Sequence, residues 1–188
     1  MSRLELIIGP MFAGKSTELL RRIRRYKLCK KNMIIIGNQI DSRSGEFIKS
    51  HNGESQKLIL VSKLSDIFLL DTYASSNIIV FDEAQFFPDL VESVKKMLND
   101  DKHILCSGLS GTFKRTPFEN ISQIISLATD ITFLTAICTY IDENNISCNC
   151  DASYTTKFKS YTKESSNVET GGSDLYTPRC YKHFIDYS

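Results

Sequence analysis

The first group of residues that could do chemistry is the glycine-rich stretch at residues 9–16, which reads GPMFAGKS. It fits the pattern G-x-x-x-x-G-K-[ST] in full, in which backbone N–H groups surround phosphate oxygens at the start of a helix. In that pattern Lys15 reaches the β- and γ-phosphates and the Ser16 hydroxyl binds Mg²⁺. A purely structural turn is the alternative, but an apolar run precedes the stretch and a helical pattern follows it. The sequence therefore predicts a phosphate-binding loop.

Two acidic residues, Asp82 and Glu83, follow the apolar run at residues 78–81. A protein with such a loop needs an acid at the end of another buried strand for the magnesium shell, so we expect Asp82 to act with Ser16 on Mg²⁺. Glu83 could act as the general base for a hydroxyl substrate, or orient a water molecule in an ATPase. An acidic strand end that faces solvent is the alternative. These residues alone predict a P-loop phosphotransferase or an ATPase.

Short apolar runs alternate along the chain with stretches of helical periodicity. We predict strands over residues 4–8, 33–36, 58–61, 78–81, 104–109 and 131–138, and helices that begin at Ser16 and cover 90–98 and 121–127. The polar stretch 41–53, rich in Gly and Ser, is predicted to be a loop. Such alternation is typical of an α/β fold with a parallel sheet flanked by helices.

The character of the chain changes near residue 139, where apolar periodicity fades and Asn, Asp, Ser, Thr, Tyr and Cys dominate. We predict one domain over residues 1–138 and a second over 139–188. Some fifty polar residues can hardly bury a core unaided, so a metal ion is expected to hold the second domain together.

The 188 residues carry a formal net charge of +1, with 41% hydrophobic and 24% charged residues. Globular composition and balanced charge argue against a nucleic-acid or membrane partner. No apolar run reaches the roughly 18 residues of a membrane span, and the acid at Glu5 argues against a secretory signal, so we expect a cytoplasmic protein. The basic stretch at 21–31 is interpreted as a solvated helix face. Residues 38–41, NQID, are a near miss to a guanine-reading N-K-x-D motif.

The six cysteines are unevenly distributed. Cys29 and Cys106 each stand alone in a stretch of helical or apolar sequence, where a small buried side chain is expected. The other four lie in the last third of the chain, with His183 close behind the last of them. They are Cys138, Cys148, Cys150 and Cys180.

In order along the chain, these motifs resemble the type II thymidine kinases, the enzymes of cytosol, bacteria and large DNA viruses. The resemblance runs from about Leu4 to Phe184. It rests on the phosphate loop together with TELLRR at 17–22, FDEAQFF at 81–87, GLSGTF at 108–113, LTAIC at 134–138, GGSDLY at 171–176 and CYKH at 180–183. Ala84 and Ser110 depart from the usual Gly and Asp, and neither departure removes a catalytic group.

This resemblance implies a P-loop NTPase-like domain with a small zinc-ribbon-like lasso domain, and transfer of the γ-phosphoryl group of ATP to the 5′-hydroxyl of thymidine with Glu83 as the catalytic base. The implied ATP-binding residues are Gly9, Pro10, Met11, Phe12, Ala13, Gly14, Lys15, Ser16, Asp41, Arg43, Asp82 and Gln85. The implied thymidine-binding residues are Met11, Phe86, Leu109, Phe113, Asn167, Val168, Glu169, Thr170, Gly171 and Tyr176, with Gln85 also near the nucleoside.

A structural zinc ion is also implied by the resemblance. Cys180 and His183 match the second ligand pair of the family in spacing, and Cys138 matches the first position of the first pair. Ile141 stands where the partner of Cys138 should be, because of an apparent insertion at 139–147. Counted back from Ala152 and Tyr154, Cys148 fits the position of the missing ligand, and Cys150 is the alternate for either Cys138 or Cys148. Zinc prefers tetrahedral sulfur and nitrogen ligands. A metal-free lobe with free thiols is the alternative.

The resemblance further implies a homotetramer and feedback inhibition by the end product dTTP. Two other functions stay open at this point. One is an ATP-binding module that has lost its substrate. The other is a deoxynucleoside kinase with a different base preference, because a lasso that recognises the base through its backbone reveals little of its specificity in its side chains.

Overall fold

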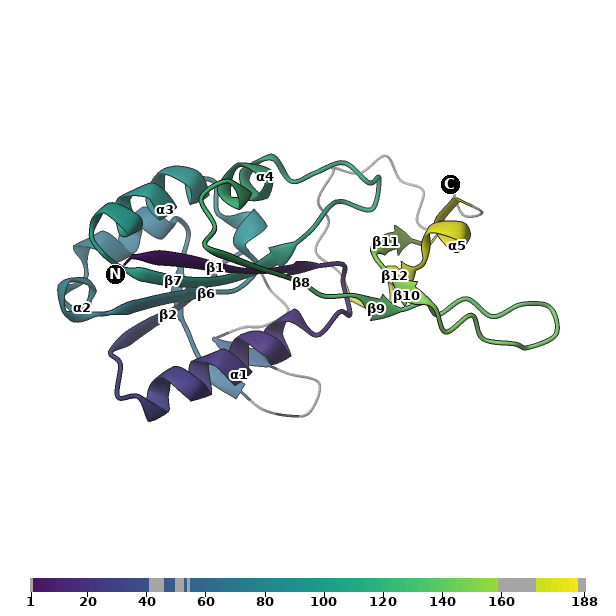
Figure 1. Ribbon diagram of the computed structural model, residues 1–188, viewed down its shortest axis with the longest axis horizontal. Helices are drawn as coiled ribbons and strands as arrows, with labels where there is room; N and C mark the ends of the chain where they lie inside the picture. Colours follow the sequence, from purple (N-terminus) through teal and green to yellow (C-terminus); the bar gives the residue numbers. More distant parts are fainter. Residues whose placement is uncertain (1, 41–45, 50–52, 54, 159–171, 186–188) are drawn as a thin grey trace.

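The computed structural model describes residues 2–40, 46–49, 53, 55–158 and 172–185 (Figure 1). The elements of the first lobe are β1 (Arg3–Gly9), α1 (Lys15–Leu28), β2 (Met33–Asn38), β3 (Phe47–Lys49), β4 (Ser55–Lys57), β5 (Ile59–Val61), η1 (Leu64–Leu69), α2 (Asp71–Ser75), β6 (Ile78–Phe81), η2 (Ala84–Phe86), α3 (Leu90–Asn99), β7 (His103–Leu109), α4 (Glu119–Ile125) and β8 (Asp130–Phe133). The main sheet has the order β5-β2-β6-β7-β1-β8 with all neighbours parallel.

Helices cover both faces of this sheet, with α1 on one face and α2, α3 and α4 on the other (Figure 1). One group of buried apolar side chains lies on each face. On α3, the side chains of Leu90, Val94 and Met97 are fully buried, as expected for one face of a helix. The predicted α/β fold of the P-loop NTPase type is confirmed. None of the helices that the structure describes is long and apolar enough to cross a membrane.

The predicted strand over residues 131–138 is wrong in its extent. β8 ends at Phe133, and β9 (Ala136–Ile137) leaves the main sheet to pair with β10 (Asp151–Ala152). The break occurs where the chain crosses the start of the phosphate loop, because the Leu134 carbonyl oxygen lies 2.3 Å from the place that a Cβ on Gly9 would occupy. Only glycine permits this approach of two backbones. Leu134 hides the break in the sequence because it continues the apolar pattern.

The prediction of a loop over residues 41–53 is also wrong in part. β3 pairs antiparallel with β4, and Ile48 in the middle of β3 is 1% exposed. This side chain joins the buried cluster on the α1 face of the sheet. One apolar residue among polar neighbours was too weak a signal for a strand of this length.

The two isolated cysteines have different environments. Cys106 is fully buried in β7, as predicted. Cys29 is exposed, so the prediction of a buried thiol there is wrong. The reason is that Cys29 is the residue at which α1 ends, where its backbone N–H bonds to the Tyr26 carbonyl and its side chain lies beyond the buried stripe of the helix.

A small second lobe follows at the carboxyl end of the main sheet (Figure 1). It contains the β9–β10 pair, the antiparallel pair β11 (Tyr154–Lys157) and β12 (Tyr176–Arg179), and the short helix α5 (Tyr181–Ile185). The loop between β9 and β10 projects away from the molecule (Figure 1). Within the described residues, the buried apolar cluster of this lobe consists of Ala136, Cys138 and Ala152. So small a core cannot stabilise the lobe by apolar burial alone.

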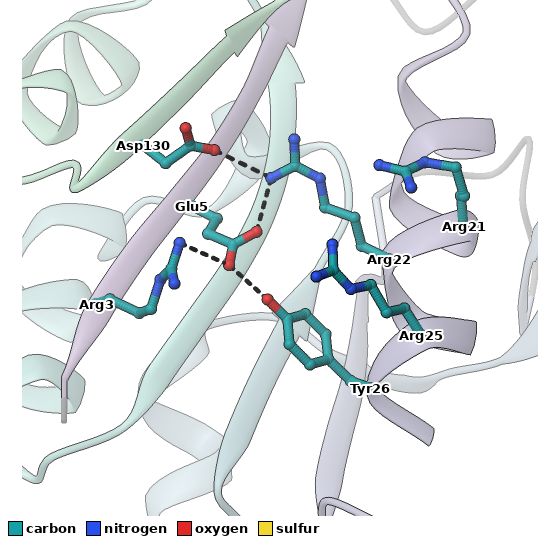
Figure 2. A pocket seen from close by; sticks show the side chains of 7 residues that line it. All are labelled: Arg3, Glu5, Arg21, Arg22, Arg25, Tyr26 and Asp130. Atoms are coloured by element: carbon teal, nitrogen blue, oxygen red, sulfur yellow. Dashed lines mark hydrogen bonds and ion pairs between the residues drawn. The ribbon is translucent and has the colours of Figure 1, made fainter. Parts of the chain in front are cut away.

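An ionic cluster around Glu5 ties α1 to the sheet, and it lines a cavity of about 300 Å³ (Figure 2). The Glu5 carboxylate is 4% exposed and lies 2.7 Å from Arg22 Nη1, 2.5 Å from the Tyr26 hydroxyl and 2.9 Å from His103 Nε2. Burial alone would raise the pKa of Glu5, but these hydrogen bonds outweigh burial and lower the pKa to about 2. Arg22 also reaches Asp130 on β8. The cluster thereby fixes the helix that follows the phosphate loop.

Candidate active site

The phosphate loop connects β1 to α1 at the edge of the sheet that faces the second lobe (Figure 1). Phe12 and Gly14 have left-handed backbones, with φ of 67° and 78°, and these residues turn the loop back on itself. The Lys15 ammonium group lies across the loop and donates to the Pro10 carbonyl at 2.7 Å. The loop therefore combines curvature, backbone N–H groups and a cation, which are the features that phosphates bind.

Asp82 stands at the end of β6, opposite the start of α1, and is 8% exposed. Its Oδ2 accepts the Ser16 hydroxyl at 2.8 Å. Its Oδ1 accepts the backbone N–H of Glu83 at 2.9 Å and also the hydroxyl of Ser107. Carboxylate and hydroxyl oxygens beside a phosphate loop are ligands that suit Mg²⁺. Asp82 and Ser16 thus fit the predicted magnesium position.

Glu83 has a left-handed backbone, with φ and ψ both 50°. This conformation is uncommon for a residue with a long side chain, and such residues cluster at functional sites. Gln85 Nε2 donates to Glu83 Oε2 at 2.6 Å, while Gln85 Oε1 accepts the Leu109 N–H at 3.0 Å. The Glu83 carboxylate is therefore held by an amide that is itself fixed at the end of β7.

Two asparagines hold η2, the short helix that follows Glu83. Asn38 Nδ2 donates to the Phe86 carbonyl at 3.1 Å. Asn120 Nδ2 donates to the carbonyls of Gln85 and Phe87 at 3.1 and 3.2 Å. Sequence reasoning missed this role of both residues, because each lies far along the chain from the motif that it supports; Asn38 was considered only as part of the NQID near miss at 38–41.

Of the side chains predicted to surround the nucleoside, Phe113 and Tyr176 meet between the two lobes. The Phe113 and Tyr176 rings stand 6.2 Å apart between centroids, one from each lobe. The Met11 N–H donates to the buried Thr155 hydroxyl at 3.0 Å, which joins the phosphate loop to β11. Phe86 and Leu109 are half-buried in η2 and at the end of β7, beside Glu83. Residues 167–171, and Asp41 and Arg43, lie outside the described residues.

A cavity of about 500 Å³ opens beside the phosphate loop. Its lining is mostly apolar and aromatic, as in many small-molecule sites. The lining residues are Phe12, Ala136, Ile137, Thr139, Phe158, Ser173, Tyr176, Thr177 and Pro178. This cavity shares Phe12 with the phosphate loop and Tyr176 with the predicted thymidine residues.

Four side chains of the second lobe converge on one point: those of Cys138, Cys148, Cys180 and His183, whose ligand atoms all lie within 4.8 Å of one another. Cys138 Sγ is 3.6 Å and Cys180 Sγ 3.4 Å from His183 Nδ1, and Cys148 Sγ is 3.9 Å from Cys180 Sγ. Ligands at about 2.3 Å from a tetrahedral zinc ion stand about 3.8 Å apart, so the spacing fits zinc. It is far too long for a disulfide bond. Cys150, the predicted alternate, is exposed and outside this cluster.

The thiols of this cluster have opposite tendencies to ionise. Burial opposes ionisation of Cys138, but hydrogen bonds from the backbones of Cys180 and Tyr140 and from the His183 side chain lower its pKa to about 6. Burial and the neighbouring thiols raise the pKa of Cys180. Ionisation of Cys138 is therefore favoured, and ionisation of the neighbouring Cys180 is disfavoured. A bound cation would remove that opposition, which again suits a metal site.

Comparison with known proteins decides the family. The family model described as thymidine kinase matches residues 2–184. The thymidine kinase of Monkeypox virus is 38% identical over 184 residues, which is 97% of each chain. The thymidine kinase of vaccinia virus strain Western Reserve is 37% identical over the same share. The chain belongs to the thymidine kinase family.

Membership in the thymidine kinase family makes the chain a nucleoside kinase, a transferase, as its motifs predicted. Among solved structures, the flagellar accessory protein FlaH from Methanocaldococcus jannaschii resembles the chain with a TM-score of 0.51. That match covers 73% of each chain at 16% identity, so it shows a shared fold alone.

The thymidine kinase motifs left out two hydroxyl side chains that the structure brings to the site, Ser107 and Thr155. Ser107 lies in β7 and bonds to Asp82. The sequence contained a sign of this role, because Ser107 is a polar residue directly after the apolar run of β7. Thr155 lies in β11 and accepts the Met11 N–H. Nothing in its local sequence pointed to a contact with the phosphate loop.

Proposed function

We propose that the chain transfers the γ-phosphoryl group of ATP to the 5′-hydroxyl of thymidine, giving dTMP and ADP. The observation that carries the proposal is the position of Glu83. Its backbone N–H bonds to Asp82, which also accepts the hydroxyl of Ser16 at the end of the phosphate loop, and its carboxylate is held by Gln85. The two lobes also bring together an aromatic pair, Phe113 and Tyr176, which a hydrolase with water as its acceptor would not need.

In this mechanism the loop and Lys15 bind the phosphates of ATP, while Ser16 and Asp82 hold Mg²⁺, which adds positive charge at the phosphate oxygens. Glu83 accepts the proton of the 5′-hydroxyl as the new O–P bond forms and the bond to ADP breaks. The Gln85 amide donates a hydrogen bond to Oε2 of the Glu83 carboxylate. The left-handed backbone and this bond fix the direction in which Glu83 accepts the proton.

The nucleoside half of the site draws on both lobes. We assign Met11, Phe86, Leu109, Phe113 and Tyr176 to the walls around thymidine, and the Met11–Thr155 bond holds the loop at the correct distance from β11. The lasso residues 167–171 and the pair Asp41 and Arg43 stay predictions, because they lie outside the described residues. Zinc at the Cys138 cluster would serve as the structural support for β12, which begins with Tyr176 and is followed directly by Cys180.

The cavity beside Phe12 is assigned to the adenine ring of ATP. It begins at the phosphate loop and extends along β9 and β12, on aromatic and apolar side chains that suit a planar base. Thr139 and Thr177 form its polar part, with their hydroxyls 2.6 Å apart. Ile137→Glu, which places a carboxylate in the wall, should raise the KM for ATP several-fold and more than the KM for thymidine, because Tyr176 of the thymidine walls lines the same cavity. The reverse pattern would contradict this assignment.

ADP release by the full chain, measured with thymidine, with deoxycytidine and without nucleoside, tests the proposal. We expect release that requires thymidine. Nucleoside-independent release or none would contradict the proposal and favour an ATPase or a non-catalytic ATP-binding module. Preference for deoxycytidine would indicate a nucleoside kinase of different base specificity. The homotetramer, inhibition by dTTP and the cytoplasmic location stay predictions from the sequence.

A further inference from the structure

Ser107 is a fully buried polar residue that no motif of the phosphate site includes. It lies in β7, and its neighbour Cys106 is paired in register with Phe81, the last residue of β6. Asp82 therefore follows β6 directly beside Ser107. The side chain of Ser107 is 0% exposed, and its hydroxyl donates to Asp82 Oδ1.

The two carboxylate oxygens of Asp82 have different partners. Oδ1 accepts two hydrogen bonds from groups that belong to the walls of the site, the Glu83 N–H and the Ser107 hydroxyl. Oδ2 accepts the hydroxyl of Ser16, the residue that the phosphate-loop pattern assigns to magnesium. One oxygen is thus anchored in the sheet, and the other faces the metal position.

The geometry points to Ser107 as a positioning residue that holds the Asp82 carboxylate for magnesium. This inference rests on the proposed function. Without the Ser107 hydroxyl, the Glu83 N–H alone would hold Oδ1, and the carboxylate could rotate about its Cβ–Cγ bond. Because groups that orient a metal ligand commonly change metal affinity by about 10–100-fold, loss of this bond should weaken the site for Mg²⁺. The phosphate loop would keep its contacts with the nucleotide.

The test compares Ser107→Ala with the wild-type chain in two binding measurements by calorimetry, ADP with excess Mg²⁺ and ADP with EDTA. We expect Ser107→Ala to weaken ADP binding about tenfold in Mg²⁺ and to leave it within about twofold in EDTA. In turnover assays, the Mg²⁺ concentration for half-maximal rate should rise by a similar factor. A general loosening of the fold would weaken both binding arms equally.

Ser76→Ala is the matched control, because Ser76 is also buried and donates its hydroxyl to the Tyr73 carbonyl at 2.8 Å, just before β6 begins. It should lower the melting temperature without changing the Mg²⁺ dependence. Ser107→Cys keeps a donor at this position, a weaker one on a slightly larger side chain, and should give an intermediate Mg²⁺ dependence if Ser107→Ala does not fold.

Equal Mg²⁺ dependence in wild type and in both Ser107 variants would overturn the role of Ser107 while leaving the proposed kinase reaction in place. Conversely, a strong Mg²⁺ defect in Ser107→Ala would support the role even if the wild-type chain released no ADP with thymidine. Absence of any Mg²⁺ effect on ADP binding by the wild-type chain would contradict both.

Discussion

In the first lobe, β1, β6 and β7 are buried on both faces, and apolar clusters on either side of the sheet hold the phosphate loop, Asp82 and Glu83 in place. In the second lobe, the described apolar cluster is Ala136, Cys138 and Ala152, and Cys138 is also one of the four Cys and His side chains that converge there. We propose that a metal ion supports the site from the second lobe, where apolar burial supports it from the first. The phosphate loop, Asp82 and Glu83 should therefore keep their structure under changes that unfold the second lobe.

The largest expected effect is the loss of the second lobe when a ligand is removed. Cys180→Ser should reduce bound zinc from about one ion per chain to nearly none, because structural zinc contributes on the order of 10 kcal/mol to small domains. Thymidine-dependent turnover should be lost, and ADP binding in Mg²⁺ should weaken as well, because β9 and β12 of the second lobe line the cavity assigned to adenine. Elemental analysis, ADP-release assays and calorimetry provide the measurements.

Cys150→Ser is the control for this prediction, because Cys150 is exposed and outside the cluster. It should keep both zinc and turnover. Full zinc content in Cys180→Ser, or loss of zinc in Cys150→Ser, would show that the four-residue cluster is not the metal site.

A smaller effect is expected in the first lobe from Glu5→Gln. Removing one partner from a buried ionic cluster should lower the free energy of unfolding by about 3 kcal/mol at pH 7. Folding lowers the pKa of Glu5 from an ordinary value of 4.5 to about 2, so its stabilisation is complete above pH 4.5 and is lost as the pH falls toward 2. Between pH 6 and pH 3, wild type should lose about 2 kcal/mol that the variant does not lose.

Urea unfolding at the two pH values measures this difference. Glu92→Gln is the control, since Glu92 is 80% exposed and pairs with Lys95 at the surface. That substitution should change the free energy of unfolding by less than about 1 kcal/mol. Parallel pH profiles for wild type and Glu5→Gln would contradict the low pKa of Glu5.

The smallest expected effect concerns the bond between the lobes. Thr155→Val keeps the side-chain shape but leaves the buried Met11 N–H without its acceptor, which should cost about 1–3 kcal/mol of stability and raise the KM for thymidine several-fold. Thr156→Val is its neighbour and control. The Thr156 hydroxyl oxygen has no hydrogen-bond partner among the described residues, so its loss should be nearly neutral. Equal effects of the two substitutions would show that the bond between the lobes has no special role.

The two lobes also differ in how much of them the sequence reveals. The phosphate loop and the pair Asp82–Glu83 could be predicted because each is a short contiguous motif next to a strand of continuous apolar residues. The break between β8 and β9 could not be predicted, because it lies where Leu134 passes close to Gly9, a contact that no local pattern records. The exposed position of Cys29 depends on where α1 ends.

Contacts across long sequence separations were the least predictable part of the site. Cys148 and Cys150 lie only two residues apart, and the sequence favoured Cys148 by its spacing alone; the structure brings Cys148, and not Cys150, together with Cys180 and His183. The bonds from Ser107 to Asp82 and from Thr155 to Met11 likewise join residues that lie far apart along the chain. The resemblance to the family suggested a role for each sequence motif. The structure added the residues outside those motifs whose hydrogen bonds fix the motif side chains in place.

Glu83→Gln tests the central claim most directly, with thymidine-dependent ADP release measured beside the binding of ADP and thymidine. The substitution keeps the size of the side chain and removes the carboxylate that accepts the proton. We predict that kcat falls about 10²–10⁴-fold, the usual contribution of a general base, while both binding constants stay within a few-fold of wild type. Turnover close to that of the wild-type chain would contradict the account.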